Sequence, residues 1–308
     1  MDPWFLRLKD KIHMKNKNKP AKTNEEEILR PSKLIWKGFQ RDKAAVVGGL
    51  MVLFILSIAI FCPLLAPHDP LKTAPENQLL SPSKEYWLGT DRFGRDQLSR
   101  LMYGTSVSML LSFGSVFIAL VVGVVIGLVS GYYGGKLDSV IMRLLDIVFA
   151  FPVILLALVV MAISGPSTLN LLLTIGFIFS VSIARVTRGS VLSVKGKEFV
   201  EGVRSVGARD TSIMFKFILP NVTAPVIVQA TFFLSLAIQI EAALSFLGLG
   251  TQPPTPSWGL MLNESRRFME LAPWLAIFPG LAIIFAVLAF NLVGDGLRNA
   301  LDPRMSQR

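Results

Sequence analysis

Long uncharged apolar segments dominate the sequence. Residues 101–135, 147–184, 217–240 and 271–294 contain no Asp, Glu, Lys or Arg. About 20 apolar residues in a helix span the roughly 30 Å hydrocarbon core of a bilayer, and several segments reach that length. The turn signal at 164–167 divides one segment that is too long for a single crossing. The pattern therefore predicts six membrane-spanning helices, at 44–66, 107–129, 139–163, 168–187, 222–247 and 273–294.

The distribution of basic residues predicts how these helices are oriented. If both termini lie in the cytoplasm, the cytoplasmic segments hold 24 of the 31 Lys and Arg residues, and the external segments hold seven. Cytoplasmic loops of membrane proteins carry such an excess of Lys and Arg. We therefore expect an all-α polytopic membrane protein with six transmembrane helices and both termini cytoplasmic. The same bias accounts for the net charge of +10 without a nucleic-acid partner.

The composition agrees with a membrane protein. Hydrophobic residues make up 52% of the chain and charged residues only 17%, with a mean hydropathy of +0.55. Soluble domains carry about 25% charged residues. These values exclude a soluble enzyme and a nucleic-acid binder. The single cysteine, Cys62, excludes an internal disulfide.

Composition also divides the chain into regions. Residues 1–32 are mainly polar and charged, so we expect a disordered cytoplasmic tail. Residues 33–43 mix aromatic and basic side chains, which favours a helix at the membrane interface. The remainder, 44–308, forms the six-span domain, with an external loop at 67–106 and a cytoplasmic loop at 188–221.

Few ionisable groups fall within the predicted spans. Glu241 lies deep in the fifth span, where a carboxylate must face the bundle, a water-filled cavity or a partner. We expect a structural hydrogen bond there, with lining of a transport path as the alternative. Arg143 and Asp146 stand three residues apart near the inner end of the third span, where they can pair on one helix face, or contribute to a path. Both histidines, His13 and His68, lie outside the spans, and no Walker A motif occurs, so the sequence predicts neither a metal site nor catalysis.

The long cytoplasmic loop 188–221 contains signals for two short helices. The first is predicted at 198–206 and ends at Gly207, the usual residue after a helix C-terminus. The second is predicted at 210–218 and ends at Pro220. Two short helices form a compact unit, which either packs under its own bundle or docks into another protein.

This loop resembles the cytoplasmic signature of ABC importer permeases. The sequence Glu201-Gly202-Val203, three residues, Gly207, nine residues and then Phe217-Ile218-Leu219-Pro220 is similar to the family pattern. That pattern is usually Glu-Ala-Ala, three residues, Gly, nine residues and Ile-x-Leu-Pro. Here Gly202 and Val203 replace the two alanines, and Phe217 stands where isoleucine is expected.

Other motifs resemble one branch of that family, the second or C-type permease subunit of dipeptide, oligopeptide and nickel importers. The likeness covers about residues 33–304. The segments that carry it are Leu88-Gly89-Thr90-Asp91, Gly94-Arg95-Asp96 with Ser99-Arg100, Gly131-Tyr132-Tyr133-Gly134-Gly135-Lys136-Leu137-Asp138, Leu244-Ser245-Phe246-Leu247-Gly248-Leu249-Gly250, Pro256-Ser257-Trp258-Gly259, Gly294-Asp295-Gly296-Leu297-Arg298 and Asp302-Pro303.

The resemblance implies a type I ABC importer fold in a bacterial or archaeal cell membrane. The chain would be the permease subunit of an ATP-driven peptide importer and would form half of the translocation path. Its partners would be a homologous second permease, one or two cytoplasmic ABC ATPase subunits and an external solute-binding protein. ATP and Mg²⁺ would be bound by the ATPases, so we expect no cofactor in this chain and no enzymatic activity of its own.

The resemblance also implies roles for particular residues. The helix that carries Glu201 would be the coupling helix, seated in a groove of an ATPase, and Trp258 would contact the binding protein. The residues expected to couple the permease to the ATPase are Glu201, Gly202, Val203, Gly207, Ile218, Leu219 and Pro220.

The sequence leaves two alternatives open. Nickel, glutathione or another small solute could be the substrate of the same fold, because selectivity would reside largely in the separate binding protein. A stand-alone secondary carrier is an alternative of another class, which predicts dependence on an ion gradient and no ATPase partner.

Overall fold

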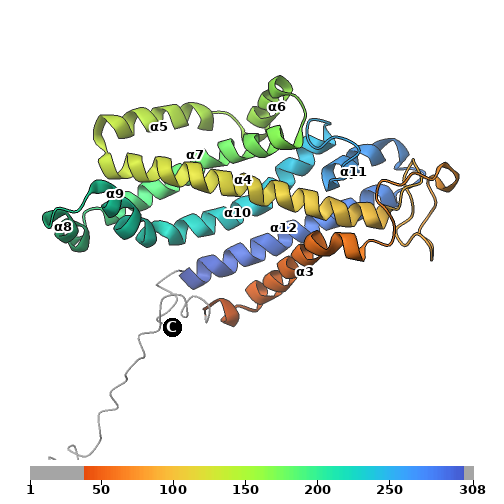
Figure 1. Cartoon of the computed structure of the whole chain (residues 1–308), viewed down its shortest axis with the longest axis horizontal. Helices are drawn as coiled ribbons and strands as arrows, with labels where there is room; N and C mark the ends of the chain where they lie inside the picture. Colours follow the sequence, from red (N-terminus) through yellow and green to blue (C-terminus); the bar gives the residue numbers. More distant parts are fainter. Residues whose placement is uncertain (1–37, 302–308) are drawn as a thin grey trace, which may run out of the picture.

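The computed structural model describes residues 38–301, and these form an elongated bundle of helices (Figure 1). The long helices are α3 (Lys43–Leu65), α4 (Gln97–Tyr133), α5 (Gly135–Phe149), α6 (Val153–Ser164), α7 (Thr168–Val194), α10 (Leu219–Phe246) and α12 (Trp274–Leu301). The short ones are η1 (Pro75–Asn77), α8 (Glu198–Ser205), α9 (Asp210–Ser212), η2 (Ile213–Ile218), α11 (Trp258–Ser265) and η3 (Arg266–Phe268). Within this described range there is no β-strand beyond a single bridge between Thr90 and Asp96.

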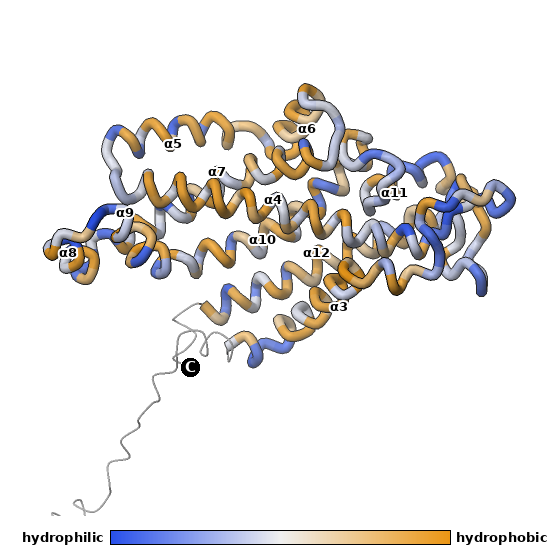
Figure 2. The backbone as a smooth tube through the Cα atoms, viewed as in Figure 1, coloured by the Kyte–Doolittle hydropathy of each residue, from blue (hydrophilic) through white to orange (hydrophobic). Residues whose placement is uncertain are grey.

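The helices confirm the prediction of a polytopic membrane protein. Five helical segments are long and apolar enough to cross a membrane, and the bent pair of α5 and α6 brings the number to six if it counts as one span. Figure 2 shows hydrophobic residues along the middle of the bundle and hydrophilic residues gathered at its two ends. This distribution is typical of a bundle whose middle lies in hydrocarbon.

We name the two ends of the bundle by the short helices that they carry. The α8 end holds α8 and both ends of the described chain (Figure 1). There the amide of Asn299 donates a hydrogen bond of 3.2 Å to Asp42, which precedes α3. The α11 end is opposite and holds α11 together with the segment 66–96. Six crossings therefore return the chain to the end at which it starts.

Several predicted boundaries differ from the structure, in which α7 and α12 each extend seven residues beyond the predicted ends of the fourth and sixth spans. The second span begins at Gln97, ten residues before the predicted start, because Asp96 caps it by accepting hydrogen bonds from the amide and hydroxyl of Ser99. The third span is broken between α5 and α6, which meet at 86°. Pro152 causes the break, since it lacks an N–H and disfavours a helical conformation at Phe151.

The fifth span also differs, because its helix does not begin after Pro220. A continuous helical segment runs from Asp210 to Phe246, with a π-helical turn at Ile213–Ile218. Pro220 lies just after this wider turn, a local π adjustment of the kind that accommodates a proline inside a continuous membrane helix. The prediction that the second short helix ends at Pro220 is therefore wrong, and the cytoplasmic loop predicted at 188–221 is joined to the fifth span by a continuous helix.

The tightest packing in the bundle joins α4 to α7. Glycines at every fourth position of α4 let the two backbones approach closely, as in small-residue motifs of membrane helices. A methyl group at Gly127 would lie 2.5 Å from the carbonyl oxygen of Ala184, and one at Gly123 would lie 2.6 Å from that of Ser180. These helices form a fixed frame from which α5 and α8 project.

The region before α3 is only partly described. Residues 38–41 are helical, and Asp42 separates them from α3. The remainder of the interfacial helix predicted at 33–43, the tail at 1–32 and residues 302–308 lie outside the described residues.

Candidate functional site

The predicted coupling helix exists as α8 and projects from the bundle (Figure 1). Its first turn contains Glu198 and Glu201, whose negative charges complement the helix N-terminus. Val200 is fully buried and packs with Ile213 and Met214 in a small apolar cluster at the α8 end. The side chains of Glu201 and Arg204 are exposed. Val200, with the half-buried Val203, therefore packs the helix onto the bundle, while its charged side chains are exposed.

Polar contacts hold α8 against the end of α4. The hydroxyl of Tyr132 donates a hydrogen bond of 2.6 Å to Oδ1 of Asp210, at the start of α9. Arg204 donates to the same hydroxyl at 3.3 Å, and its guanidinium lies 5.5 Å from the centre of the Tyr132 ring. Lys195 donates to the carbonyl oxygen of Gly131 at 2.9 Å. These contacts make α8 and the end of α4 a single unit.

The turn after α8 is open to its surroundings. Gly207 has a φ of +80°, a conformation that favours glycine, and its N–H donates to the carbonyl oxygen of Arg204 at 3.0 Å. Among residues 38–301, no atom lies within 4 Å of a methyl group built at either Gly202 or Gly207. Val206 between them is 83% exposed. The small residues of this motif are therefore not needed for packing within the described chain.

The seven predicted coupling residues separate into two groups. Glu201, Gly202 and Gly207 are exposed on α8 and its turn, and Val203 is half-buried. Ile218 is fully buried, whereas Leu219 is half-buried and Pro220 exposed. The first group forms a surface that another protein can reach. The second group belongs to the continuous helix that links this surface to α10.

At the α11 end, four charged side chains form a buried network. Arg95 pairs with Asp91 at 2.6 Å, and Arg100 pairs with Glu264 at 2.6 Å. Cross-contacts of 3.4 Å and 3.5 Å join the two pairs. All four side chains are at most 12% exposed. The network ties the start of α4 to α11, and it explains why Asp91, Arg95 and Arg100 stand in one motif.

Glu241 lies fully buried in α10. The hydroxyl of Ser245 donates to its Oε1 at 2.9 Å, and the hydroxyl of Ser108 on α4 donates to its Oε2 at 3.2 Å. The same Ser108 oxygen accepts the backbone N–H of Trp258 at 3.4 Å. This carboxyl group thus joins α4, α10 and α11, which supports a structural role.

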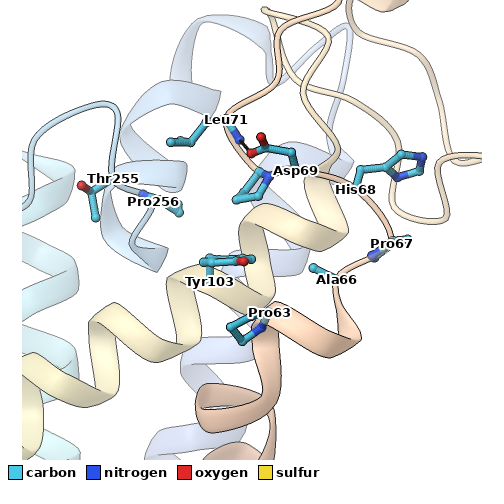
Figure 3. Close-up of a pocket in the computed structure, with 10 residues that line it drawn as sticks. Pro63, Ala66, Pro67, His68, Asp69, Leu71, Tyr103, Thr255 and Pro256 are labelled. Atoms are coloured by element: carbon cyan, nitrogen blue, oxygen red, sulfur yellow. Dashed lines mark hydrogen bonds between the residues drawn. The ribbon is translucent and has the colours of Figure 1, made fainter.

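Trp258 is packed inside the chain. Its side chain is 2% exposed, and its indole N–H donates to the carbonyl oxygen of Leu101 at 3.4 Å. The prediction that Trp258 contacts an external protein is wrong for this reason. The nearby surface instead contains an open cavity of about 640 Å³ (Figure 3). The cavity lies between the segment after α3 and the segment before α11, and it is lined by Pro63, Ala66, Pro67, His68, Asp69, Pro70, Leu71, Tyr103, Thr255 and Pro256.

The predicted pair of Arg143 and Asp146 does not form. Asp146 instead pairs with Arg185 of α7, with 2.6 Å between Oδ1 and Nη2. Arg143 is exposed on α5. Arg185 could not be recognised from the sequence as the partner of Asp146, because the two residues lie 39 positions apart. The close approach of α5 and α7 that joins them is a property of the fold.

The family described as "Binding-protein-dependent transport system inner membrane component" matches residues 123–307. This chain belongs to that family. A second family, the N-terminal transmembrane domain of oligopeptide transport permease C, matches residues 30–82. Together these matches confirm the predicted resemblance to C-type permeases of ABC importers.

Several named permeases are similar to this one over nearly their whole length. The dipeptide transport system permease protein DppC of Alkalihalophilus pseudofirmus is 44% identical over 94% of this chain and 95% of its own. The di/tripeptide transport system permease protein DppC of Pseudomonas aeruginosa is 42% identical over 94% and 97%. The glutathione transport system permease protein GsiD of Pectobacterium atrosepticum is 43% identical over 91% and 94%.

A solved structure supports the fold of this permease. The MetNI methionine ABC transporter in an inward-facing conformation matches with a TM-score of 0.55 and 17% identity. The match covers 67% of this chain and 97% of the other. It confirms the predicted fold class, that of an ABC importer permease.

Proposed function

We propose that this permease is a transmembrane subunit of an ATP-driven importer of dipeptides and short oligopeptides. Relatives named as dipeptide or di/tripeptide permeases are 42–44% identical to it over at least 90% of its length. A homologous second permease would supply the other half of the translocation path. The chain itself would catalyse no reaction, and ATP and Mg²⁺ would be bound by separate cytoplasmic ATPase subunits.

The observation that carries this proposal is the exposed surface of α8. Glu201, Gly202 and the turn at Gly207 are exposed and project from the bundle, and there is open space in the described chain around a methyl group built at either glycine. We assign this surface to the groove of an ABC ATPase, in which the Glu201 carboxylate is available to a basic side chain. Because the helix from Asp210 runs without interruption into α10, movement of the ATPase would be transmitted directly to a span.

We assign the α8 end to the cytoplasm and the α11 end to the outside. Seven Lys and Arg residues in 185–221 support this orientation, as does the basic N-terminal segment. The α11 end would then face a solute-binding protein. Its rigid surface, with the cavity beside Asp69 and Tyr103, is the region that we assign to this contact (Figure 3).

Glutathione is the second candidate substrate. The support for it is the relative named as a glutathione transport permease, which is 43% identical over 91% of this chain. Glutathione is itself a small peptide, so the translocation path would accommodate the same class of substrate for both candidates. The binding protein that associates with the complex would decide between them.

The test is to purify the tagged full-length chain from its native membrane in a mild detergent. Mass spectrometry would identify the proteins that accompany it, and ATP hydrolysis would be measured with and without vanadate. We expect a second permease, one or two ATPases and vanadate-sensitive hydrolysis. Reconstitution with the associated binding protein and candidate peptides would then name the substrate.

Two controls make this test decisive. Variants Glu201→Lys and Gly207→Trp should lose the ATPase from the preparation while the chain remains in the membrane. A chain that emerges alone, without ATPase activity, and that does not crosslink to an ATPase from position 207 would contradict the proposal. Uptake driven by an ion gradient would then favour a stand-alone carrier.

A further inference from the structure

The ion pair of Asp146 and Arg185 is unusual in its position. Asp146 lies 11 residues beyond the start of α5 at Gly135, about 17 Å along the helix. Arg185 lies nine residues before the end of α7 at Val194, about 14 Å along that helix. Neither residue is therefore at the α8 end of its helix. The pair lies within the length of the bundle.

The pair is also exposed on the surface of the isolated chain. The side chain of Asp146 is 63% exposed and that of Arg185 is 33% exposed. Within residues 38–301, Nε of Arg185 has no hydrogen-bond partner. Charged side chains that face lipid within a bilayer are energetically costly and are therefore rare. An exposed ion pair at this depth therefore argues against lipid on this face.

The helix break beside the pair also argues against lipid on this face. Backbone that is not helical at membrane depth is tolerated only where protein or a water-filled cavity satisfies it. The break at 150–152 follows directly after Phe149, whose ring lies 4.1 Å from the guanidinium of Arg185. In the described chain, α6 begins at Val153 with no side chain capping its free N–H groups. Polar backbone and the ion pair are thus exposed side by side.

Helix α5 itself supports this view. Within the described chain it buries none of its residues, and its exposed side chains divide into two faces. Leu144 and Ile147 are 59% and 61% exposed on an apolar face, whereas Arg143 and Asp146 are exposed on a polar face. The exposed middle of α3 is apolar, with Leu53 61% exposed. The chain therefore has one exposed face that suits lipid and another that suits water.

We propose that Asp146 and Arg185 line the water-filled translocation path of the importer. This inference rests on the proposed function and deepens it, because it assigns residues of the path. A peptide with free termini carries one ammonium and one carboxylate group. The carboxylate of Asp146 and the guanidinium of Arg185 offer one opposite charge to each of these groups.

The test measures the water accessibility of single cysteines in the assembled complex. Cys62 is replaced by Ala, and Met142→Cys is introduced one helical turn from Asp146, which leaves the ion pair intact. The matched control is Leu53→Cys on α3. Inverted membrane vesicles that contain the complex are treated with a membrane-impermeant trimethylammonium methanethiosulfonate, and the rate of labelling is measured.

We expect Met142→Cys to react about tenfold faster than Leu53→Cys or more, because the reactive thiolate forms in water and not in lipid. The variant Asp146→Cys should react at a similar rate to Met142→Cys. Equally slow labelling of all three positions would overturn the inference. If the complex still contained its ATPase and hydrolysed ATP, the proposed function would stand while this assignment failed.

A second measurement tests the charges themselves. The double variant Asp146→Asn with Arg185→Gln keeps a polar contact but removes both charges. We expect uptake of a dipeptide to fall about tenfold, because hydrogen bonds to charged groups are stronger than those to neutral ones. Labelling at Met142→Cys should persist in this background. Unchanged uptake would overturn the role of the charges.

Discussion

The two ends of this permease use their charged side chains in opposite ways. At the α11 end, Asp91, Arg95, Arg100 and Glu264 pair with one another and are at most 12% exposed. At the α8 end, the charged residues of α8 are exposed, and within residues 38–301 Arg204 contacts the bundle through Tyr132. The four charges of the network at the α11 end are paired within the chain, whereas the exposed charges of α8 are available to a partner.

This difference indicates which end of the bundle needs no partner protein to pair its charged side chains. A buried ion-pair network fixes the start of α4 to α11, so the α11 end is rigid before any partner binds. The α8 surface instead keeps open space around Gly202 and Gly207 in the described chain. Substitutions at the α11 end should therefore act on folding, and substitutions on α8 should act on assembly.

The largest effect is expected from Arg100→Ala. Removing Arg100 leaves the buried carboxylate of Glu264 with only the longer 3.4 Å contact to Arg95, and breaking a buried ion pair costs about 3–5 kcal/mol. Thermal unfolding in detergent should show a marked loss of stability, and little protein should reach the membrane. The double variant Arg100→Met with Glu264→Met should lose less. An equal loss in both variants would show that packing, and not charge, holds this end together.

Gly202→Trp should leave the fold intact and abolish uptake. In the described chain there is open space within 4 Å of a methyl group built at Gly202. A large side chain at this position would therefore contact a partner protein and not the permease itself. The matched control, Gly202→Ala, should retain uptake and stabilise α8 by up to about 1 kcal/mol, because alanine favours a helix over glycine. Unfolding temperature and ATPase co-purification would be measured together. Normal uptake by Gly202→Trp would contradict the assignment of α8 as the coupling surface.

The sequence was sufficient to predict the elements that depend on local pattern. Hydropathy identified all six crossings, and the signals at Glu198 and Gly207 located α8 to within one residue. Both features follow from short stretches of sequence. The break of the third span was missed because the apolar run through Phe151-Pro152 is uninterrupted, although that Pro was the available signal.

Features that join distant segments could not be predicted from the sequence. Arg95 and Arg100 precede their partner Glu264 by more than 160 residues, and Asp146 finds Arg185 on another helix. The start of α4 was placed too late for a related reason. Its first turn, Gln97 to Arg100, is polar, and its burial depends on α11 and α12. Trp258 was predicted to contact another protein. Its burial depends on α4, which is distant in the sequence, so the sequence around Trp258 does not reveal it.

Glu241 lies in the bundle between the two ends. Its variants test whether buried hydrogen bonds within the chain also stabilise the middle of the bundle. Glu241→Leu would leave the buried hydroxyls of Ser108 and Ser245 without their acceptor, at a cost of about 1–3 kcal/mol. Glu241→Gln keeps the shape and an acceptor oxygen, so its stability should change by about 1 kcal/mol or less. Both would be measured by thermal unfolding, with uptake as the second measurement. Complete loss of uptake by a stable Glu241→Gln would favour a role in the transport path.

The smallest effect is expected at Asp42, a charge of the α8 end that is satisfied within the chain. Its carboxylate accepts hydrogen bonds from the N–H of Ala45, the amide of Asn299 and the N–H of Ala44. These contacts hold the pKa of Asp42 below its ordinary value of 3.8. Because the pKa is lower in the folded state, the stabilisation is present above the unfolded pKa and is lost as the pH falls through the folded value.

Two variants separate the charge of Asp42 from its capping role. Asp42→Ala should cost about 0.5–2 kcal/mol at neutral pH, since it removes the N-cap of α3, whereas Asp42→Asn keeps a capping oxygen and should cost less. Unfolding would be followed in detergent at pH 7 and near pH 3. The advantage of wild type over Asp42→Asn should shrink at the acidic pH, because the stabilisation by the Asp42 charge is lost as the pH falls toward and through its lowered pKa. A difference that stays constant would show that the charge contributes nothing, and that α3 and α12 are held at this end by packing alone.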